Sequence, residues 1–348
     1  MKAVYLYTKS SFQTSLRSDT LWGLIISALS VLKSKDEMDQ LVNLFLDTKP
    51  PFVISSVMYF SKNENNKIVH YLPKPIVCNF EYEIDSAIKM TYYKKFKKLN
   101  IVNQSNFEDL INGRISDKDL FQEYISYMEL LNKPKLNEEE KDRLDKYKLL
   151  FSIPSTKNEL VMHNTIDRMS GSTLEKDDAG QLYYTDEKFL DENEGLFFLI
   201  EGDFSIIEPA LRFLVHFGFG GNNTIGKGNF RYEIKDFNIN MPKDNVNSFI
   251  SLSLFNPKQN ELDDFMKEEN KDKLWYELEF RAGRIGVHFA EDPDKNHKDI
   301  VANFKEGSSF PNIDLKFPGR ILQTGKSNTH NIYSNGLAFK IPSNLKYE

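Results

Sequence analysis

Alternating and helical spacings of apolar residues predict a strand, a helix and a second strand at the start of the chain. Residues 2–8 alternate and are rich in β-forming types, which indicates a strand. Apolar residues then recur at helical spacing from Leu21 to Leu32, behind an N-cap and first-turn acid offered by Ser18 and Asp19. Residues 52–60 indicate the strand that follows.

The same order recurs after residue 195. Residues 196–201 form a short apolar run typical of a buried strand. Glu208 and Pro209 predict a helix start, the helix ends near Gly218, and residues 230–234 indicate another strand. Strand, helix, strand, repeated once, is the ferredoxin-like order, so we expect an α+β fold.

A long insertion and a second domain complete this prediction. The insertion covers about residues 62–194, and its residues 107–150 have helical spacing, with Leu120, Tyr124, Met128 and Leu131 on one face. A polar stretch after residue 235 separates an N-terminal domain, 1–240, from a C-terminal domain, 241–348. In the second domain, candidate strands cover residues 249–255, 274–280, 313–323 and 336–341. We expect a second ferredoxin-like domain there.

Composition indicates a protein without a general affinity for nucleic acid. The formal net charge is −6, which argues against a surface coated with positive charge. Two windows nevertheless lack acids. Between Glu208 and Glu233 the charged residues are Arg212, Lys227 and Arg231, and residues 315–347 carry five Lys or Arg and no acid. Both windows are rich in Gly and Asn, so a local basic groove is expected.

Cysteine, histidine and apolar spacing argue against several other classes. Cys78 is the only cysteine, which favours a reducing compartment, and the longest apolar stretch, 21–32, is too short to span a membrane. We therefore expect a cytoplasmic protein with no membrane contact. No two histidines have the spacing of a metal site, and the acidic segment 291–299 is better explained as an exposed turn. No metal, cofactor or catalytic residue is expected.

The segment "GFGGNNTIGKGNF", residues 218–230, almost matches a nucleotide-binding phosphate loop. Gly221, Gly226 and Lys227 fit GxxxxGK, but Gly228 stands where Mg²⁺ binding needs Ser or Thr. A Walker A loop also leads from a strand into a helix, whereas this one leads from a predicted helix into a predicted strand. The segment is therefore expected to hold phosphates of another kind, through backbone amides and Lys227.

A hairpin is predicted inside the insertion. "HNTIDRMSGS" begins at His163, and residues 177–180 form a turn between two alternating arms. His163, Asn164 and Arg168, expected at the hairpin's base, have the chemistry to bind phosphate or base edges, although a purely structural His163 fits equally well. His163 could also act as a general acid or base in metal-free RNA cleavage, with Lys227 stabilising the charged intermediate.

Four stretches in this order resemble one family. They are "SLRSDTLWGLIISAL", "HNTIDRMSGST", "GFGGNNTIGKGNF" and the C-terminal "GRILQTGKSNTHNIYSNGLAFKIP". Together they are similar to the fourth subunit of the Csm complex, the type III-A CRISPR effector, a Cas-five-like member of the RAMP superfamily. The resemblance implies two ferredoxin-like (RRM-like) RAMP domains with a β-hairpin thumb, and a noncatalytic, RNA-binding role in antiviral defence.

The resemblance also implies partners and contact residues. The partners would be the 5′ tag of the CRISPR RNA, the large Cas-ten subunit and backbone subunit three. The implied RNA-binding residues are Ser18, Asp19, His163, Asn164, Arg168, Gly218, Gly220, Gly221, Asn222, Asn223, Thr224, Gly226, Lys227, Gly228, Arg320 and Lys326. Arg320 and Lys326 lie in the C-terminal stretch, for which an ordinary loop between strands is the alternative.

Three other functions are compatible with these residues. The chain could be the corresponding subunit of a related Cmr complex, or a metal-independent endoribonuclease that processes CRISPR RNA through His163 and Lys227. A protein scaffold without RNA contact is the third. The helices at residues 102–150 match no motif of the family, so their role is not predicted.

Overall fold

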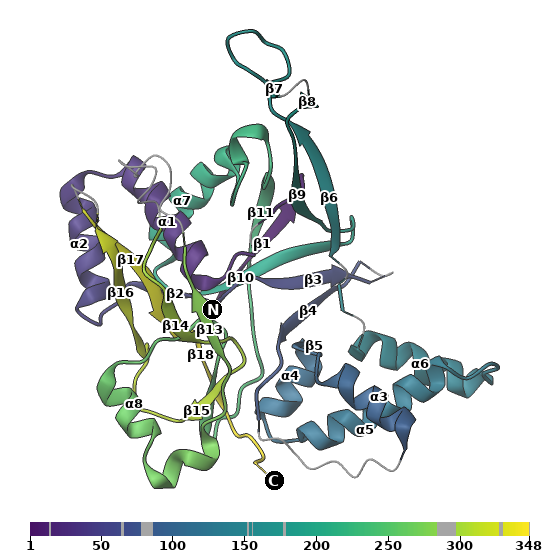
Figure 1. The fold of residues 1–348 in the computed structure, drawn as a ribbon. Helices are drawn as coiled ribbons and strands as arrows, with labels where there is room; N and C mark the ends of the chain where they lie inside the picture. Colours follow the sequence, from purple (N-terminus) through teal and green to yellow (C-terminus); the bar gives the residue numbers. More distant parts are fainter. Residues whose placement is uncertain are drawn as a thin grey trace.

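The computed structural model describes the chain except for residues 14, 64–65, 78–85, 152, 155, 177–178, 284–296, 327–329 and 348. The predictions for Cys78, for the turn at 177–178 and for most of the acidic turn 291–299 lie outside the described residues. The described residues form an α+β fold of antiparallel sheets with helices packed against them (Figure 1). The predicted fold class is confirmed at this level.

A seven-stranded antiparallel sheet forms the centre of the first half. Its strand order is β11-β1-β10-β3-β4-β5, and β2 pairs with β10. The bounds are β1 Lys2–Thr8, β2 Phe52–Ile54, β3 Met58–Lys62, β4 Ile68–Pro73, β5 Ile101–Asn103, β10 Glu194–Gly202 and β11 Phe230–Asp236. Both predicted strand–helix–strand units contribute to it, and the strand predicted at 52–60 is divided into β2 and β3.

Helices α1 (Ser18–Leu32) and α7 (Phe204–Phe217) pack against each other and bury their apolar stripes, with α2 (Lys35–Leu46) after α1. Two predicted helix starts are wrong. Arg17, not Ser18, is the N-cap of α1, and no side chain caps this helix. Helix α7 begins at Phe204, because the Asp203 side chain accepts a hydrogen bond from the Ser205 N–H at 2.9 Å. Pro209 therefore lies inside the helix.

The insertion contains a helical bundle and a hairpin. The helices are α3 Ala87–Phe96, α4 Gln104–Ile111, α5 Asp117–Leu131 and α6 Glu138–Phe151. Leu120, Tyr124 and Met128 are buried as predicted, but Leu131, at the end of α5, is half exposed. Strands β6 (Lys157–Asn164) and β9 (Leu182–Phe189) form the predicted hairpin, and the short strands β7 (Glu175–Lys176) and β8 (Ala179–Gly180) continue it. The hairpin projects from the body of the molecule (Figure 1).

The second half is built from several small sheets. Strands β12, β15 and β18 form one, β13 pairs with β14, and β16 pairs with β17. The bounds are β12 Ser248–Ser251, α8 Gln259–Phe265, β13 Leu278–Arg281, β14 Val301–Phe304, β15 Ser309–Pro311, β16 Gly319–Lys326, β17 Asn331–Leu337 and β18 Lys340–Ser343, with 3₁₀ helix η2 at Glu268–Lys273. A single ferredoxin-like sheet is not confirmed for the described residues of this half.

The hydrophobic core runs through both halves. Ile250, Leu252 and Ile341 of the second half belong to the same buried cluster as Val4 and Ile25 of the first. A smaller cluster, made largely of Phe249, Phe255, Phe265 and Phe310, is confined to the second half. The two halves are therefore packed together as one body, and the domain boundary at residue 240 stays a prediction.

Candidate RNA-binding site

The predicted glycine loop connects α7 to β11 through a series of left-handed residues. Positive φ angles occur at Gly218 (75°), Gly220 (81°), Asn222 (61°), Gly226 (85°) and Gly228 (68°), and a short 3₁₀ turn, η1, spans Asn223–Ile225. Glycine and asparagine are the residues that tolerate this backbone region. At Gly228 a side chain is also excluded by space, since a Cβ would overlap the carbonyl oxygen of Phe219.

Backbone hydrogen bonds close this loop and leave one stretch of it without partners. The Phe219 N–H donates to the Gly228 carbonyl at 3.0 Å, and the Gly228 N–H donates to the Ser11 carbonyl at 2.8 Å. The N–H groups of residues 225–227 are also bonded within the loop. Across the described parts of the chain, none of the successive N–H groups from Gly220 to Thr224 has a hydrogen-bond acceptor. These residues are half or fully exposed, so their amides are able to bind an anion.

Lys227 has partners inside the protein, and its RNA contact stays a prediction. Its ammonium nitrogen lies 2.7 Å from Glu187 Oε2 and 3.1 Å from Ser11 Oγ, to which it donates hydrogen bonds. The Glu187 side chain has no exposed surface, and it also accepts a hydrogen bond from the Ser11 hydroxyl. Lys227 is therefore the counter-ion of a buried carboxylate, and it joins the glycine loop to the hairpin.

His163 belongs to the same cluster. The Thr185 hydroxyl donates to Glu187 Oε1 at 3.1 Å, so it accepts its bond from His163 Nε2, 2.8 Å away. His163 Nε2 lies 3.4 Å from the same Glu187 oxygen. Burial by itself raises the pKa of the Glu187 carboxyl, but hydrogen bonds from Lys227, Ser11 and Thr185 outweigh that effect and lower the pKa to about 2. Glu187 is thus ionised and holds together the N-terminal segment, the hairpin and the glycine loop.

The other predicted hairpin residues lie farther out than expected. The hairpin's base is the Lys157–Phe189 end of the β6–β9 pair, whereas His163 and Asn164 pair with Tyr183 and Leu182 near its far end. Asn164 Nδ2 donates to Thr173 Oγ1 at 3.1 Å, and Arg168 is exposed in the turn that follows. The predicted position at the base is therefore wrong, although an RNA contact by these residues stays a prediction.

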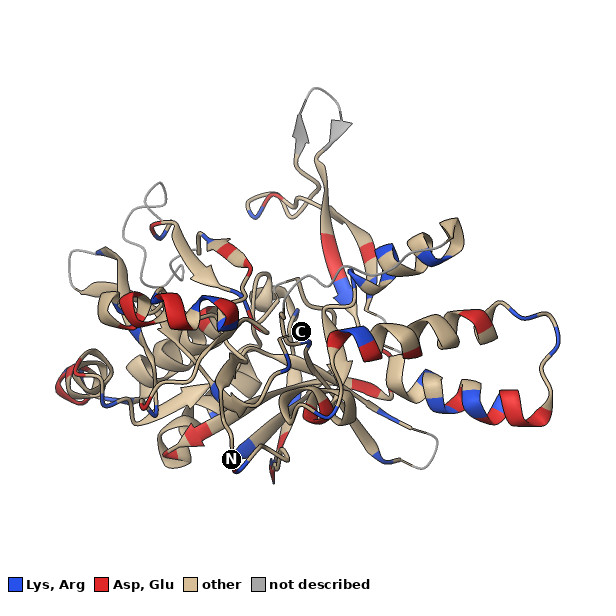
Figure 2. Cartoon of the chain, turned by 90° about the horizontal axis from the view of Figure 1, so that it is seen from below, with Lys and Arg blue, Asp and Glu red and all other residues tan. Residues whose placement is uncertain are grey.

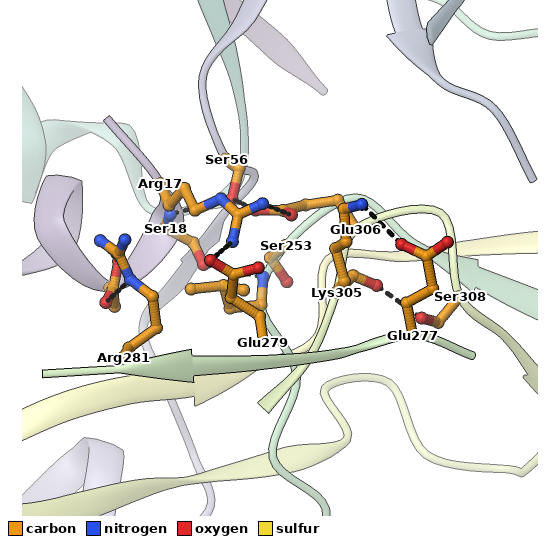
Figure 3. Close-up of polar contacts among 12 residues, drawn as sticks. Arg17, Ser18, Ser56, Ser253, Glu277, Glu279, Arg281, Lys305, Glu306 and Ser308 are labelled. Atoms are coloured by element: carbon orange, nitrogen blue, oxygen red, sulfur yellow. Dashed lines mark hydrogen bonds and ion pairs between the residues drawn. The ribbon is translucent and has the colours of Figure 1, made fainter. Parts of the chain in front are cut away.

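Ser18 and Asp19 form contacts between the two halves. Ser18 is fully buried, and its hydroxyl accepts a hydrogen bond from the Leu254 N–H at 3.0 Å. Arg281 Nε donates to Asp19 Oδ2 at 3.1 Å. Figure 3 shows this region, in which Arg17, next in the chain, faces charged side chains from strand β13. RNA contact by Ser18 and Asp19 stays a prediction, but their polar atoms already serve the interface between the halves.

Arg320 and Lys326 lie on strand β16, in the second half. Both are exposed, and Arg320 Nε donates to Asn256 Oδ1 at 2.8 Å. In the described residues no hydrogen bond or ion pair connects them to the glycine loop. The structure brings together Lys227, His163 and the loop amides, and it places the C-terminal pair on a different element.

Folding brings carboxylates to the predicted acid-free window. Arg212 pairs with Glu208 at 2.7 Å, Lys227 with Glu187 at 2.7 Å, and Arg231 with Glu233 at 2.8 Å. Figure 2 shows Lys, Arg, Asp and Glu interspersed on the same elements. Each of the three cations in the window is therefore paired with a carboxylate, from Glu208 and Glu233 at its borders and from Glu187 of the hairpin, so the expected basic groove has no unpaired charge from these residues.

Sequence reasoning did not find Glu187, Ser11 or Thr185. Glu187 lies in "LYYTDEKF", where polar residues are as numerous as apolar ones, so nothing distinguishes a buried carboxylate from exposed neighbours. The available signal was the alternation that puts Tyr183, Thr185 and Glu187 on the same face as His163 of the facing strand.

The described part of the chain contains no group of three or more His, Cys, Asp or Glu side chains placed to hold a metal ion. Among its helices, none combines the length and the apolar composition needed to cross a membrane.

Residues 244–343 match the family model of the CRISPR Csm4 C-terminal domain. The chain is 23% identical over 367 residues to the CRISPR system Cms protein Csm4 of Methanocaldococcus jannaschii, covering 94% of this chain and 91% of the relative. It is 25% identical over 261 residues to the protein of the same name from Thermococcus onnurineus, covering 72% and 74%. The chain is thus similar to Csm4 proteins over most of its length, and its second half matches the Csm4 C-terminal domain. These matches confirm the resemblance found in the sequence.

Solved structures of Csm4 assemblies share the fold of this chain. A Csm1–Csm4 cassette in complex with cA4 matches with a TM-score of 0.59 at 21% identity, over 99% of this chain and 98% of that chain. A Csm3–Csm4 subcomplex of the type III-A interference complex matches with a TM-score of 0.59 at 19% identity, over 99% and 100%. The fold is therefore shared over nearly the full length of both chains.

Proposed function

We propose that this chain is a noncatalytic subunit of a type III-A Csm effector complex that holds the 5′ tag of the CRISPR RNA. In this proposal it joins a Csm1-type large subunit (Cas-ten) to Csm3-type backbone subunits. Similarity to Csm4 proteins supports the assembly role, since similar Csm4 chains form a cassette with Csm1 and a subcomplex with Csm3. The same similarity favours a Csm complex over a Cmr complex.

The row of unpartnered backbone amides carries the tag-binding part of the proposal. The N–H groups of Gly220 to Thr224 lack acceptors within the described residues and follow one another along a half-exposed loop. Consecutive N–H groups of this kind form an anion-binding concavity, and a phosphate oxygen is a suitable acceptor. Because the cations near the loop are paired with acids, we expect the amides to provide most of the phosphate binding.

The hairpin provides side chains beside this loop. Lys227 and Glu187 hold its base against the glycine loop, so the two elements keep a fixed relationship. Tyr184 is exposed on one face of the hairpin, and Tyr183 stacks on His163 on the other, with ring centroids 5.2 Å apart. Stacking of a base on an aromatic ring contributes about 1–3 kcal/mol, so an exposed tyrosine is suited to the nucleotides at the tag-to-guide boundary.

The first half fits a ferredoxin-like unit with the hairpin and helices inserted. Strands β11, β1, β10 and β3 follow one another in the sheet, which is the antiparallel order of that unit, and α1 and α7 are its two helices. In this arrangement the glycine loop joins the second helix to the last strand, and the hairpin belongs to the connection before β10.

A pair of matched asparagine variants tests tag binding. Asn222 in the glycine loop has φ 61°, and Asn66 in the β3–β4 turn has φ 57°. Asn222→Asp places a carboxylate beside the free amides, where it would compete with and repel a phosphate, and Asn66→Asp makes the same change elsewhere at the same backbone conformation. Complexes would be assembled from each variant with purified partners and guide RNA, and trimming of the RNA by a 5′ exonuclease would be measured.

We expect Asn222→Asp to speed trimming about tenfold, the effect of losing about 1.4 kcal/mol of binding, and Asn66→Asp to leave it unchanged. Equal protection by both variants would contradict tag binding at this loop. Ultraviolet crosslinking in the same complexes addresses the scaffold alternative, because a chain without RNA contact would give no crosslink.

A metal-independent endoribonuclease is the second candidate, since the structure places His163 and Lys227 on the same carboxylate. This pairing also weakens the candidate, because Glu187 already takes the positive charge that would stabilise a transition state. Incubation of the pure chain with repeat RNA and no metal distinguishes an endoribonuclease from a noncatalytic subunit. We expect no cleavage, whereas site-specific cleavage that His163→Ala abolishes would make the chain an enzyme.

A further inference from the structure

The strand pair β13–β14, which we call the ribbon, has its charged and apolar faces reversed. Leu278 and Phe280 point to solvent, with 51% and 68% of their surfaces exposed. Glu279 and Arg281, which alternate with them, are half-buried and face the body of the protein. A half-buried strand normally presents apolar residues to the core and charged residues to water. This reversal requires an explanation on each face.

On the inner face, ion pairs fix the ribbon to the first half. Arg17 Nη1 lies 2.8 Å from Glu279 Oε1 as an ion pair without hydrogen-bond alignment, and Arg17 Nη2 lies 3.3 Å from Glu306 Oε2. Arg281 pairs with Asp19 at 3.1 Å. Figure 3 shows Glu279 and Arg281 of β13, with Glu277 just before the strand, on this side. The ribbon is therefore held in place by polar contacts, and its apolar face is not needed for that purpose.

On the outer face, apolar side chains from both strands form one surface. Tyr276, Leu278 and Phe280 follow one another on the β13 side, and Ala302 lies opposite Phe280 in the register. Ile300, just before β14, is 73% exposed. This face presents no Lys or Arg among its described residues, so its chemistry does not suit RNA. A contiguous exposed apolar patch on a rigid element is typical of a protein interface.

We propose that the outer face of the ribbon binds the Csm1-type large subunit through an apolar surface on that partner. This inference rests on the proposed function. Similar Csm4 chains form two-subunit cassettes with Csm1, and an assembly of two chains needs an apolar interface core. The glycine loop and the hairpin are assigned to RNA in the proposed function, whereas the outer face of the ribbon is apolar and suits a protein partner. Because ion pairs already hold the ribbon in place, little conformational freedom is lost on binding.

Cysteine labelling tests where the face is covered. Phe280→Cys would be made in a Cys78→Ser background and reacted with a maleimide, alone and with each purified partner. We expect fast labelling of the free chain, strong protection by the Csm1-type subunit and none by the Csm3-type subunit. Slow labelling of the free chain would show that the chain's own segment covers the face, and protection by the Csm3-type subunit alone would assign it to another partner. Either result overturns the proposal.

Binding measurements with a matched control complete the test. Phe280→Asp is compared with Leu149→Asp, since Leu149 is also an exposed apolar residue, on helix α6. We expect Phe280→Asp to weaken binding of the Csm1-type subunit by roughly tenfold or more and Leu149→Asp to leave it unchanged. Equal binding by both variants contradicts the proposal. Asn222→Asp should keep full affinity for that subunit, so failure of tag binding and failure of ribbon docking give separate results.

Discussion

The ammonium group of Lys227 lies 2.7 Å from the carboxylate of Glu187, a side chain with no exposed surface. Lys227 comes from the glycine loop and Glu187 from strand β9 of the hairpin, so this single pair fixes the distance between the two elements proposed to hold RNA. Ser11 and Thr185 complete the carboxylate's hydrogen bonds. A buried ion pair contributes little net stability, but loss of one partner leaves an uncompensated charge.

Lys227→Met is therefore expected to destabilise the fold by about 3 kcal/mol, because Glu187 would remain buried without its counter-ion. Adding Glu187→Gln removes that charge, so the double variant should be more stable than Lys227→Met alone. Urea unfolding of the two single variants and the double variant measures the coupling energy. Additive effects, with no recovery in the double variant, would mean that the pair does not act as a unit.

Gly228→Ala is expected to be far more disruptive than Gly226→Ala. Both residues have positive φ, at 68° and 85°, so both substitutions carry a backbone penalty of about 1–2 kcal/mol. At Gly226 nothing lies near the new Cβ, whereas at Gly228 it overlaps the carbonyl oxygen of Phe219, the residue whose N–H closes the loop by donating to the Gly228 carbonyl. The midpoints of thermal unfolding compare the two directly, and similar values would show that the loop does not need this close approach.

Stability is expected to fall between pH 6.5 and 4.5 because of His70. Its Nδ1–H donates to Gln104 Oε1 at 3.0 Å, so Nε2 accepts the Tyr5 hydroxyl at 2.8 Å, which requires a neutral ring. Burial lowers the pKa of His70 from 6.5 to about 4, against a smaller opposing effect of the Gln104 hydrogen bond. In this pH range the unfolded chain binds a proton on His70 that the folded chain excludes. The free energy of unfolding therefore falls by about 2 kcal/mol as the pH is lowered.

His70→Gln should remove most of this pH dependence of stability, and the midpoints of urea unfolding at several pH values would measure it. The carboxyl of Glu187 titrates at lower pH than His70. Its pKa is depressed to about 2, so its stabilisation is complete above about pH 4.5 and is lost below that value. A slope between pH 6.5 and 4.5 that persists in His70→Gln would assign the effect to another group.

Local features were predictable from the sequence, and contacts between distant segments were not. Helix α1, the hairpin and the glycine loop follow from spacing and turn residues within about 20 positions. Glu187 and Lys227 are separated by 40 positions, and each resembles an ordinary surface charge. The ribbon shows the same limit, because the alternation in β13 indicates two faces and does not say which one is inside. Arg17 and Asp19, more than 250 positions away, decide that question.

Arg17→Met is expected to loosen the ribbon without unfolding the rest of the chain. Glu306 is nearly buried, and besides Arg17 it is hydrogen-bonded by the Ser56 hydroxyl, so losing the guanidinium leaves a poorly compensated carboxylate. We expect the substitution to destabilise the packed ribbon by about 2 kcal/mol. This is less than for a fully buried pair, because the Arg17 side chain keeps some contact with solvent. Hydrogen exchange should then accelerate in the amides of β13 and remain slow in β1 and β10. Arg17→Met combined with Glu306→Gln should restore part of the protection, whereas uniform acceleration across the sheet would mean that these ion pairs stabilise the whole fold and do not hold the ribbon specifically.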